Sequence, residues 1–214
     1  MRESGVFPSR AEDWKTVASV LYRAFSEDEN LRTLKRFRVE EFPDFFRLSC
    51  EFFMESGNLL SWIYWDEGEP AGALLAIPYN WSAPVSFLWR FFLKFWKKIG
   101  WRSFSSVFTI IKSSWLSRPR KPCLRILFLG VVSGARCKGI GKELLKEAER
   151  ASVFPSLQLE VEKENLPAVS LYLKEGFKKQ REFRLGKVTF LVMVKELSQK
   201  EEPDQGENRD QYGD

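Results

Sequence analysis

Residues 124–150 read LRILFLGVVSGARCKGIGKELLKEAER, and this stretch decides the fold. Its first nine residues are almost all apolar, and such a continuous run favours a strand buried on both faces. After Gly139, apolar residues recur three and four positions apart, which is the spacing of an amphipathic helix. The stretch therefore predicts a strand over 124–132, a loop that contains glycine, and a helix.

The loop between this strand and this helix is suited to an anion. The first amide groups of a helix have no partner within it, and the helix dipole makes that end positive. Gly139 and Gly141 let the backbone approach a ligand closely. Three cationic residues add charge: Arg136, Lys138 and Lys142. We expect a phosphate-like ligand here. The alternative is a strand–helix turn whose glycines serve geometry alone, since neither GxGxxG nor GxxxxGK(S/T) is present.

Two motifs resemble those of the GNAT superfamily of N-acetyltransferases. Arg136-x-x-Gly139-x-Gly141 is similar to that family's (R/Q)-x-x-G-x-(G/A) signature. Further along, the pattern N-x-x-A-x-x-L-Y-x-x-x-G-F resembles the second family motif, and it is formed by Asn165, Ala168, Leu171, Tyr172, Gly176 and Phe177. The motifs follow the family's order, and the resemblance covers roughly residues 124–195.

The resemblance implies a fold and an activity. The fold is α/β (α+β), with a mixed, mostly antiparallel central sheet flanked by helices. In this family the strand that corresponds to residues 157–161 splays from the preceding strand, and the acetyl-pantetheine arm lies in the gap. The implied reaction moves an acetyl group from acetyl-CoA to a primary amine of a small-molecule or peptide acceptor. The amine attacks directly in a ternary complex.

The resemblance also implies cofactor-binding residues. Amides from residues 137–142 would hold the pyrophosphate, and amides near Gly130 and Val131 would polarise the thioester carbonyl. The cofactor-binding set is Val131, Val132, Ser133, Arg136, Cys137, Lys138, Gly139, Ile140, Gly141, Lys142, Asn165 and Tyr172. Asn165 is expected either to bond the cofactor or to cap the helix that begins near Pro167.

The implied catalytic residues are an acid and a base. Tyr172 matches the family tyrosine that protonates the leaving thiolate; the alternative is a packed helix tyrosine. The chain has no histidine, and 124–132 lacks the carboxylate that many relatives carry there. Glu160 and Glu162 share one strand face by alternation, so either is a candidate base, and a solvated surface role is the alternative.

Charge is distributed unevenly along the chain. The net charge is +5, but the tail from residue 196 onward carries about −5, which leaves the rest about +10. Between Glu69 and Glu143 there is no acidic residue and there are thirteen Lys or Arg. Such a field attracts anions. CoA is the favoured partner, a membrane surface ranks below it, and nucleic acid ranks lowest.

Other features set the expected compartment and partners. Three widely spaced cysteines form neither a disulfide framework nor a metal-binding spacing, so we expect no metal and a cytoplasmic location. We see no secretory signal or spanning segment. The acceptor is expected to be a small amine, and a homodimer is compatible with the sequence.

Periodicity and turn residues predict the remaining elements. Strands are expected at 6–8, 59–65 and 70–77, and a closing hairpin at 177–184 and 187–195. Helices are expected at 9–25, opened by a Ser9–Glu12 capping box, and at 41–56. The acidic residues 27–29 either meet a cationic acceptor or form a solvated loop.

Residues 80–117 are expected to form a helical insertion between the third and fourth strands, with helices over 86–99 and 101–116. Residues 1–196 then form a single GNAT-like domain, and 197–214 an acidic, disordered tail. Because 86–99 is aromatic and basic, the competing hypothesis is a membrane-surface or nucleic-acid binding module on a GNAT scaffold with little catalysis.

Overall fold

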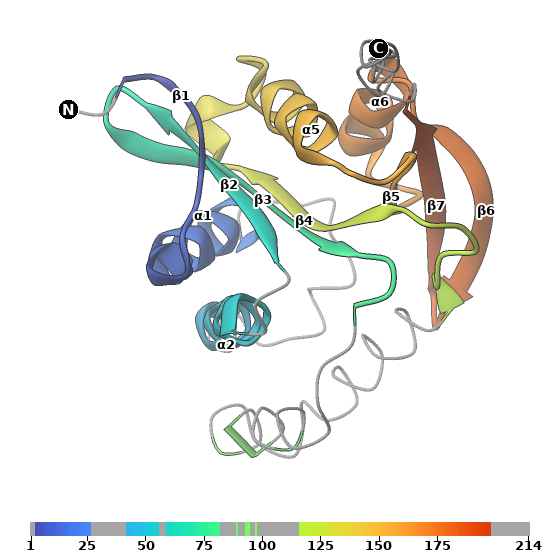
Figure 1. Cartoon of the computed structure of the whole chain (residues 1–214), viewed down its shortest axis with the longest axis horizontal. Coiled ribbons are helices and arrows are strands. Elements are labelled where there is room, and N and C mark those ends of the chain that lie inside the picture. The colour runs from blue at the N-terminus through green and yellow to red at the C-terminus, as the bar shows by residue number, and fades with distance from the viewer. Residues whose placement is uncertain are drawn as a thin grey trace, which may run out of the picture.

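The computed structural model describes residues 3–26, 42–55, 59–81, 89, 93–94, 97 and 116–197 (Figure 1). A seven-stranded sheet has the order β1-β2-β3-β4-β5-β7-β6. Its strands are β1 Gly5–Pro8, β2 Leu60–Asp66, β3 Glu69–Pro78, β4 Leu124–Val131, β5 Ser156–Glu162, β6 Lys178–Leu185 and β7 Val188–Glu196. Among the described strands β4 and β5 pair in parallel and every other pair is antiparallel. The predicted mixed, mostly antiparallel sheet is therefore confirmed.

Helices cover both faces of this sheet. Helices α1 (Trp14–Ser26) and α2 (Phe42–Glu55) lie on one side in Figure 1, and α5 (Ile140–Ala151) and α6 (Leu166–Lys174) lie on the other. A cluster of three aromatic rings joins α1 and α2 to β4. Phe25 and Phe46 stack at 5.3 Å between centroids, and the Phe128 ring meets Phe46 edge-on at 5.7 Å. Such ring pairs stabilise beyond the area that they bury.

The predicted capping box lies one residue later than expected, at Arg10 and Asp13, and α1 itself begins only at Trp14. A short 3-10 turn, Ala11–Asp13, precedes α1, and the backbone N–H of Arg10 donates to the Asp13 carboxylate at 2.8 Å. The Ser9 hydroxyl instead bonds the hydroxyl of Ser61 on β2. The motif predicted a local cap, but the pairing of β1 with β2 placed Ser9 beside the sheet.

The predicted closing hairpin is confirmed, since β6 and β7 pair antiparallel around Gly186, whose φ is 62°. The strands expected at 59–65 and 70–77 also form a hairpin, because β2 and β3 pair antiparallel around the turn at Glu67 and Gly68. Strand β7 inserts between β5 and β6. Gly176 follows α6 with φ 88°, a left-handed conformation that suits glycine at the end of a helix.

Strands β4 and β5 separate soon after they pair. The parallel register joins Leu124 to Leu157, Arg125 to Gln158 and Ile126 to Leu159, and it stops there. Beyond this point β4 stays paired with β3 and β5 stays paired with β7. The splay that the family resemblance implied is therefore present, and it opens toward the start of α5.

Two glycines let helices approach the sheet beside this splay. A Cβ on Gly130 of β4 would lie 2.9 Å from the Cβ of Ala24 in α1. A Cβ on Gly72 of β3 would lie 2.8 Å from Cγ2 of Ile140, the first residue of α5. Side chains at these positions would push α1 or α5 away from the sheet.

Several expectations fall outside the described residues. They are the acidic segment 27–29, the helices over 86–99 and 101–116 apart from a few positions, and the tail beyond 197. Of that insertion, the described Trp89 is 63% exposed, and Lys94 forms an ion pair with Glu51 of α2. Across the described parts of the chain, no helix has the length and apolarity to cross a bilayer.

Gly72→Ala is expected to lower the free energy of unfolding by about 1–3 kcal/mol, because the added methyl group overpacks the contact with Ile140. Urea denaturation measures this change. Gly134→Ala is the matched control, since its added Cβ would meet no atom within 4 Å. Equal stability of the two variants would contradict the close approach.

Candidate active site

The loop between β4 and α5 makes a tight double turn. A 3-10 turn over Ser133–Ala135 follows β4, and Arg136 is extended. Cys137 has φ 64° and Gly139, the N-cap of α5, has φ 86°. A Cβ on Gly139 would meet no atom within 4 Å, so the loop presents open space at the start of the helix. The loop is exposed from Arg136 to Gly139.

Backbone amides in this loop are available to a ligand. Within the described residues, no backbone carbonyl accepts from the amides of Cys137, Lys138 or Gly139. The first amides of α5 have no partner within a helix, as at any helix start. Consecutive free donors at the positive end of a 12-residue helix fit a pyrophosphate group. The residues present therefore fit the implied cofactor through main-chain donors.

The side chain of Arg136 anchors the loop. Its Nη2 donates to the carbonyl of Ala24 in the last turn of α1 at 2.8 Å, and its Nε donates to the carbonyl of Val131 at 3.3 Å. A cation at the C-terminal end of a helix is favourable. Arg136 thus ties the end of β4 to α1, in addition to any charge it offers to a ligand.

Both lysines of the loop form ion pairs with neighbouring elements. Lys138 Nζ lies 2.9 Å from Oδ2 of Asp66 at the end of β2, and Lys142 Nζ lies 3.6 Å from Oε1 of Glu175 after α6. The hydrogen bond and charge of Asp66 raise the pKa of Lys138. The cationic loop predicted from the sequence is therefore largely neutralised by carboxylates distant in the chain.

The gap between β4 and β5 exposes a backbone donor. The N–H of Val132 donates to the carbonyl of Ala71 at 2.9 Å, so it points toward β3. Successive N–H groups of a strand point in opposite directions. The N–H of Val131 is consequently directed toward the gap. Of the two residues expected to polarise a carbonyl, Val131 has the suitable orientation and Gly130 does not.

Tyr172 and Asn165 belong to α6, Asn165 as its N-cap. Tyr172 is 8% exposed and packs against Phe177 at 5.8 Å between ring centroids. Its burial raises the pKa of the hydroxyl well above the ordinary tyrosine value. The Oδ1 of Asn165 accepts from the amide of Ala168 at 3.3 Å, so the capping role expected for Asn165 is confirmed.

The two candidate bases differ in their surroundings. Glu160 forms an ion pair with Arg125, and its Oε1 accepts from both Nε and Nη2 of that side chain. Glu162 lies two residues further along β5, past the last rung shared with β4, and is 3% exposed. By alternation both carboxylates face the same side of the sheet as Arg125. Both residues lie past the last residue pair that β5 shares with β4, which is Ile126 with Leu159.

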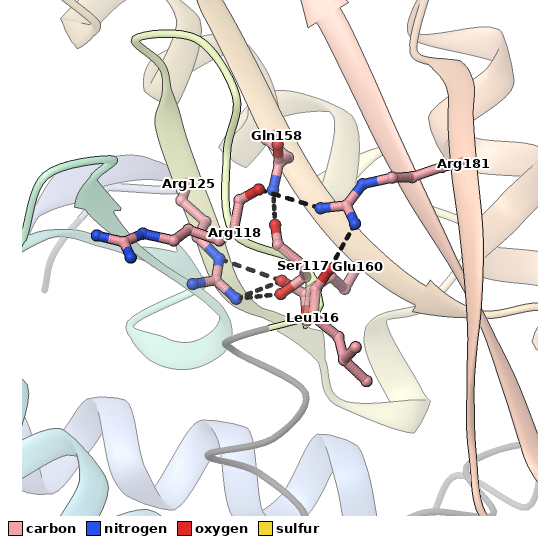
Figure 2. A network of polar contacts seen from close by, with 7 residues as sticks. All are labelled: Leu116, Ser117, Arg118, Arg125, Gln158, Glu160 and Arg181. Atoms are coloured by element: carbon pink, nitrogen blue, oxygen red, sulfur yellow. Dashed lines mark hydrogen bonds and ion pairs between the residues drawn. The ribbon is translucent and has the colours of Figure 1, made fainter.

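A polar network closes the paired end of the gap (Figure 2). Arg125 Nη2 donates to the Ser117 hydroxyl at 2.7 Å, and Gln158 Nε2 donates to the Ser117 carbonyl at 2.7 Å. Arg181 of β6 donates to the carbonyls of Leu116 and Arg118. Ser117 is fully buried. Strands β5 and β6 thus hold the chain at 116–118 by its backbone carbonyls, and β4 holds it through the Ser117 hydroxyl. Glu160 belongs to this network through Arg125.

Comparison with known proteins identifies the family. A model described as "Acetyltransferase (GNAT) family" matches residues 21–177. The chain belongs to this family. No curated protein matches it.

Solved structures share the fold over most of the chain. A Corynebacterium glutamicum structure described as histone acetyltransferase HPA2 and related acetyltransferase has a TM-score of 0.61 at 19% identity, covering 92% of this chain and 98% of that one. PaiA N-acetyltransferase of Thermoplasma acidophilum, in complex with coenzyme A, has a TM-score of 0.56 at 17% identity, covering 91% and 99%. Arabidopsis thaliana NAA60, in complex with a bisubstrate analogue, has a TM-score of 0.52 at 19% identity, covering 91% of this chain and 98% of that one.

Sequence reasoning missed the partners of the predicted residues. No sequence motif indicated the roles of Asp66, Glu175 and Arg125, because each meets its partner only through a tertiary contact. The alternation of charged residues on β5 was the one available signal for the Arg125–Glu160 pair. Among the described residues, no three potential metal ligands come together.

Arg125→Met is expected to lower the free energy of unfolding by about 2–3 kcal/mol, because it leaves Glu160 without its countercharge. The pair's side chains are only 11% and 18% exposed. The double variant Arg125→Met/Glu160→Met should recover most of this loss, since it leaves no unpaired charge. Chemical denaturation of the wild type and both variants measures the free energy of unfolding. A double variant less stable than the single one would contradict the interpretation.

Proposed function

We propose that this protein transfers an acetyl group from acetyl-CoA to a primary amine of a small-molecule or peptide acceptor. One observation carries the proposal: a loop of unpartnered amides lies at the start of α5, beside the gap between β4 and β5. Family membership supports acetyl transfer, and the relatives named above include one bound to coenzyme A and one bound to a bisubstrate analogue.

The proposed cofactor site uses the backbone. Amides of residues 137–142 bind the pyrophosphate, and Val131, Val132 and Ser133 line the pantetheine arm. Ile140 is buried in the core, so it contributes its amide and not its side chain. Acetyl-CoA supplies an activated acetyl thioester at the gap. The N–H of Val131 donates to the thioester carbonyl oxygen, where negative charge develops during attack.

In the proposed mechanism the protein mainly aligns the two substrates, since orientation alone can supply about 7 kcal/mol of the barrier or more. Glu160 or Glu162 takes the proton of the attacking amine, directly or through water. Tyr172, held protonated by its burial, donates a hydrogen bond or proton to the departing sulfur.

Release of free thiol from acetyl-CoA tests the proposal. The full chain is incubated with acetyl-CoA and a panel of amines that includes spermidine, amino acids, an aminoglycoside and peptides with free N-termini. Acetylated product, identified by mass spectrometry, supports the proposal. If no amine accepts the group and acetyl-CoA does not bind in calorimetry, the proposal fails.

Gly139→Glu is expected to abolish measurable acetyl-CoA binding in calorimetry. The new side chain would occupy the open space at the start of α5 and would repel phosphate. Gly186→Glu is the control, because it places the same charge at another glycine of positive φ, in the β6–β7 turn. Undiminished affinity of Gly139→Glu would contradict the placement of the pyrophosphate.

Tyr172→Phe is expected to lower kcat about 100-fold while leaving acetyl-CoA affinity nearly unchanged. The raised pKa keeps the hydroxyl protonated, so the wild-type kcat should lose no activity through this group up to pH 10, where an ordinary tyrosine is about half ionised. Initial rates from pH 6 to 10 measure both effects. Equal rates for wild type and variant would remove the acid role.

A further inference from the structure

The three cationic side chains of the β4–α5 loop and the first turn of α5 all bind oxygen atoms of the protein itself. Arg136 binds backbone carbonyls, Lys138 pairs with Asp66, and Lys142 pairs with Glu175. The two carboxylates come from different elements, the end of β2 and the residue that follows α6. They therefore flank the start of α5 from two sides.

Further carboxylates surround Lys138. Glu67 also acts on Lys138, and the charges of Glu143 and Asp66 act on the nearby Tyr64. A phosphate that approaches the loop therefore meets carboxylates as well as ammonium groups. The amides attract it, and the carboxylates oppose it until the lysines change partner.

Both lysines are able to change partner. Their side chains are 58% and 51% exposed, and an ammonium group on a flexible stem reorients easily. The side chains of Asp66 and Glu175 are 28% and 11% exposed, so solvent weakens these pairs mainly at their lysine ends. A phosphate is a stronger and more highly charged acceptor than a carboxylate, so exchange in its favour is expected.

We propose that Asp66 and Glu175 are internal counter-anions that compete with the cofactor's phosphates for Lys138 and Lys142, and thereby weaken the binding of acetyl-CoA and of the CoA product. The inference rests on the proposed function. Release of CoA returns the lysines to these carboxylates, so the two residues hold cofactor affinity below what the loop alone would reach. If the carboxylates instead held the lysines in place for phosphate, removing them would weaken CoA binding.

Calorimetry with CoA and with pantetheine, which lacks phosphate, tests this proposal. Asp66→Asn and Glu175→Gln should each tighten CoA binding about 2- to 5-fold and steepen its dependence on salt. Pantetheine binding should not change. Glu147→Gln is the matched control, because it removes the same charge from a pair with Arg150 within α5 and should leave CoA affinity unchanged.

A double-variant cycle distinguishes two effects of Asp66: competition with the CoA phosphate for Lys138, and direct repulsion of the phosphate. Lys138→Gln should weaken CoA binding, and adding Asp66→Asn to it should give little further gain. Asp66→Ser provides a second variant, and thermal melts verify that each is folded. Unchanged or weaker CoA binding by folded Asp66→Asn and Glu175→Gln would overturn this inference alone. Failure of the wild type to bind acetyl-CoA would overturn the proposed function as well.

Discussion

The separation of β4 from β5 is the constraint on which the rest of the structure depends. Parallel pairing ends at Ile126 and Leu159, yet both strands continue, because β3 holds one and β7 holds the other. Beyond the split β4 stays bonded to β3 and β5 stays bonded to β7, so the gap loses only the hydrogen bonds that β4 and β5 would have made to each other. Helices α1 and α5 pack close to the sheet at Gly130 and Gly72, and they support the open end from opposite faces.

The closed end of the gap is held by polar groups and not by apolar packing. Gln158 and Arg181 donate to backbone carbonyls at 116–118, and Arg125 donates to the Ser117 hydroxyl (Figure 2). Buried backbone carbonyls need such partners. The same network binds Glu160, whose carboxylate pairs with Arg125.

The β4–α5 loop shows why residue type is an incomplete guide to a site. Arg136, Lys138 and Lys142 indicated a basic phosphate site, and each is bound to an oxygen of the protein. The free donors are main-chain amides, whose availability depends on the left-handed turns at Cys137 and Gly139. In this loop the backbone geometry sets which amides are presented, and carboxylates from other elements offset its side-chain charge.

The sequence alone determined the order of elements, the strand–loop–helix at 124–150, the hairpins and the family, because apolar periodicity and turn residues act locally. It also determined the Asn165 cap and the left-handed Gly176. Tertiary structure decided the insertion of β7 between β5 and β6, and the partners of the loop lysines. The reason is physical: an ion pair or a strand neighbour depends on distances between segments remote in the chain, and no local pattern encodes those distances.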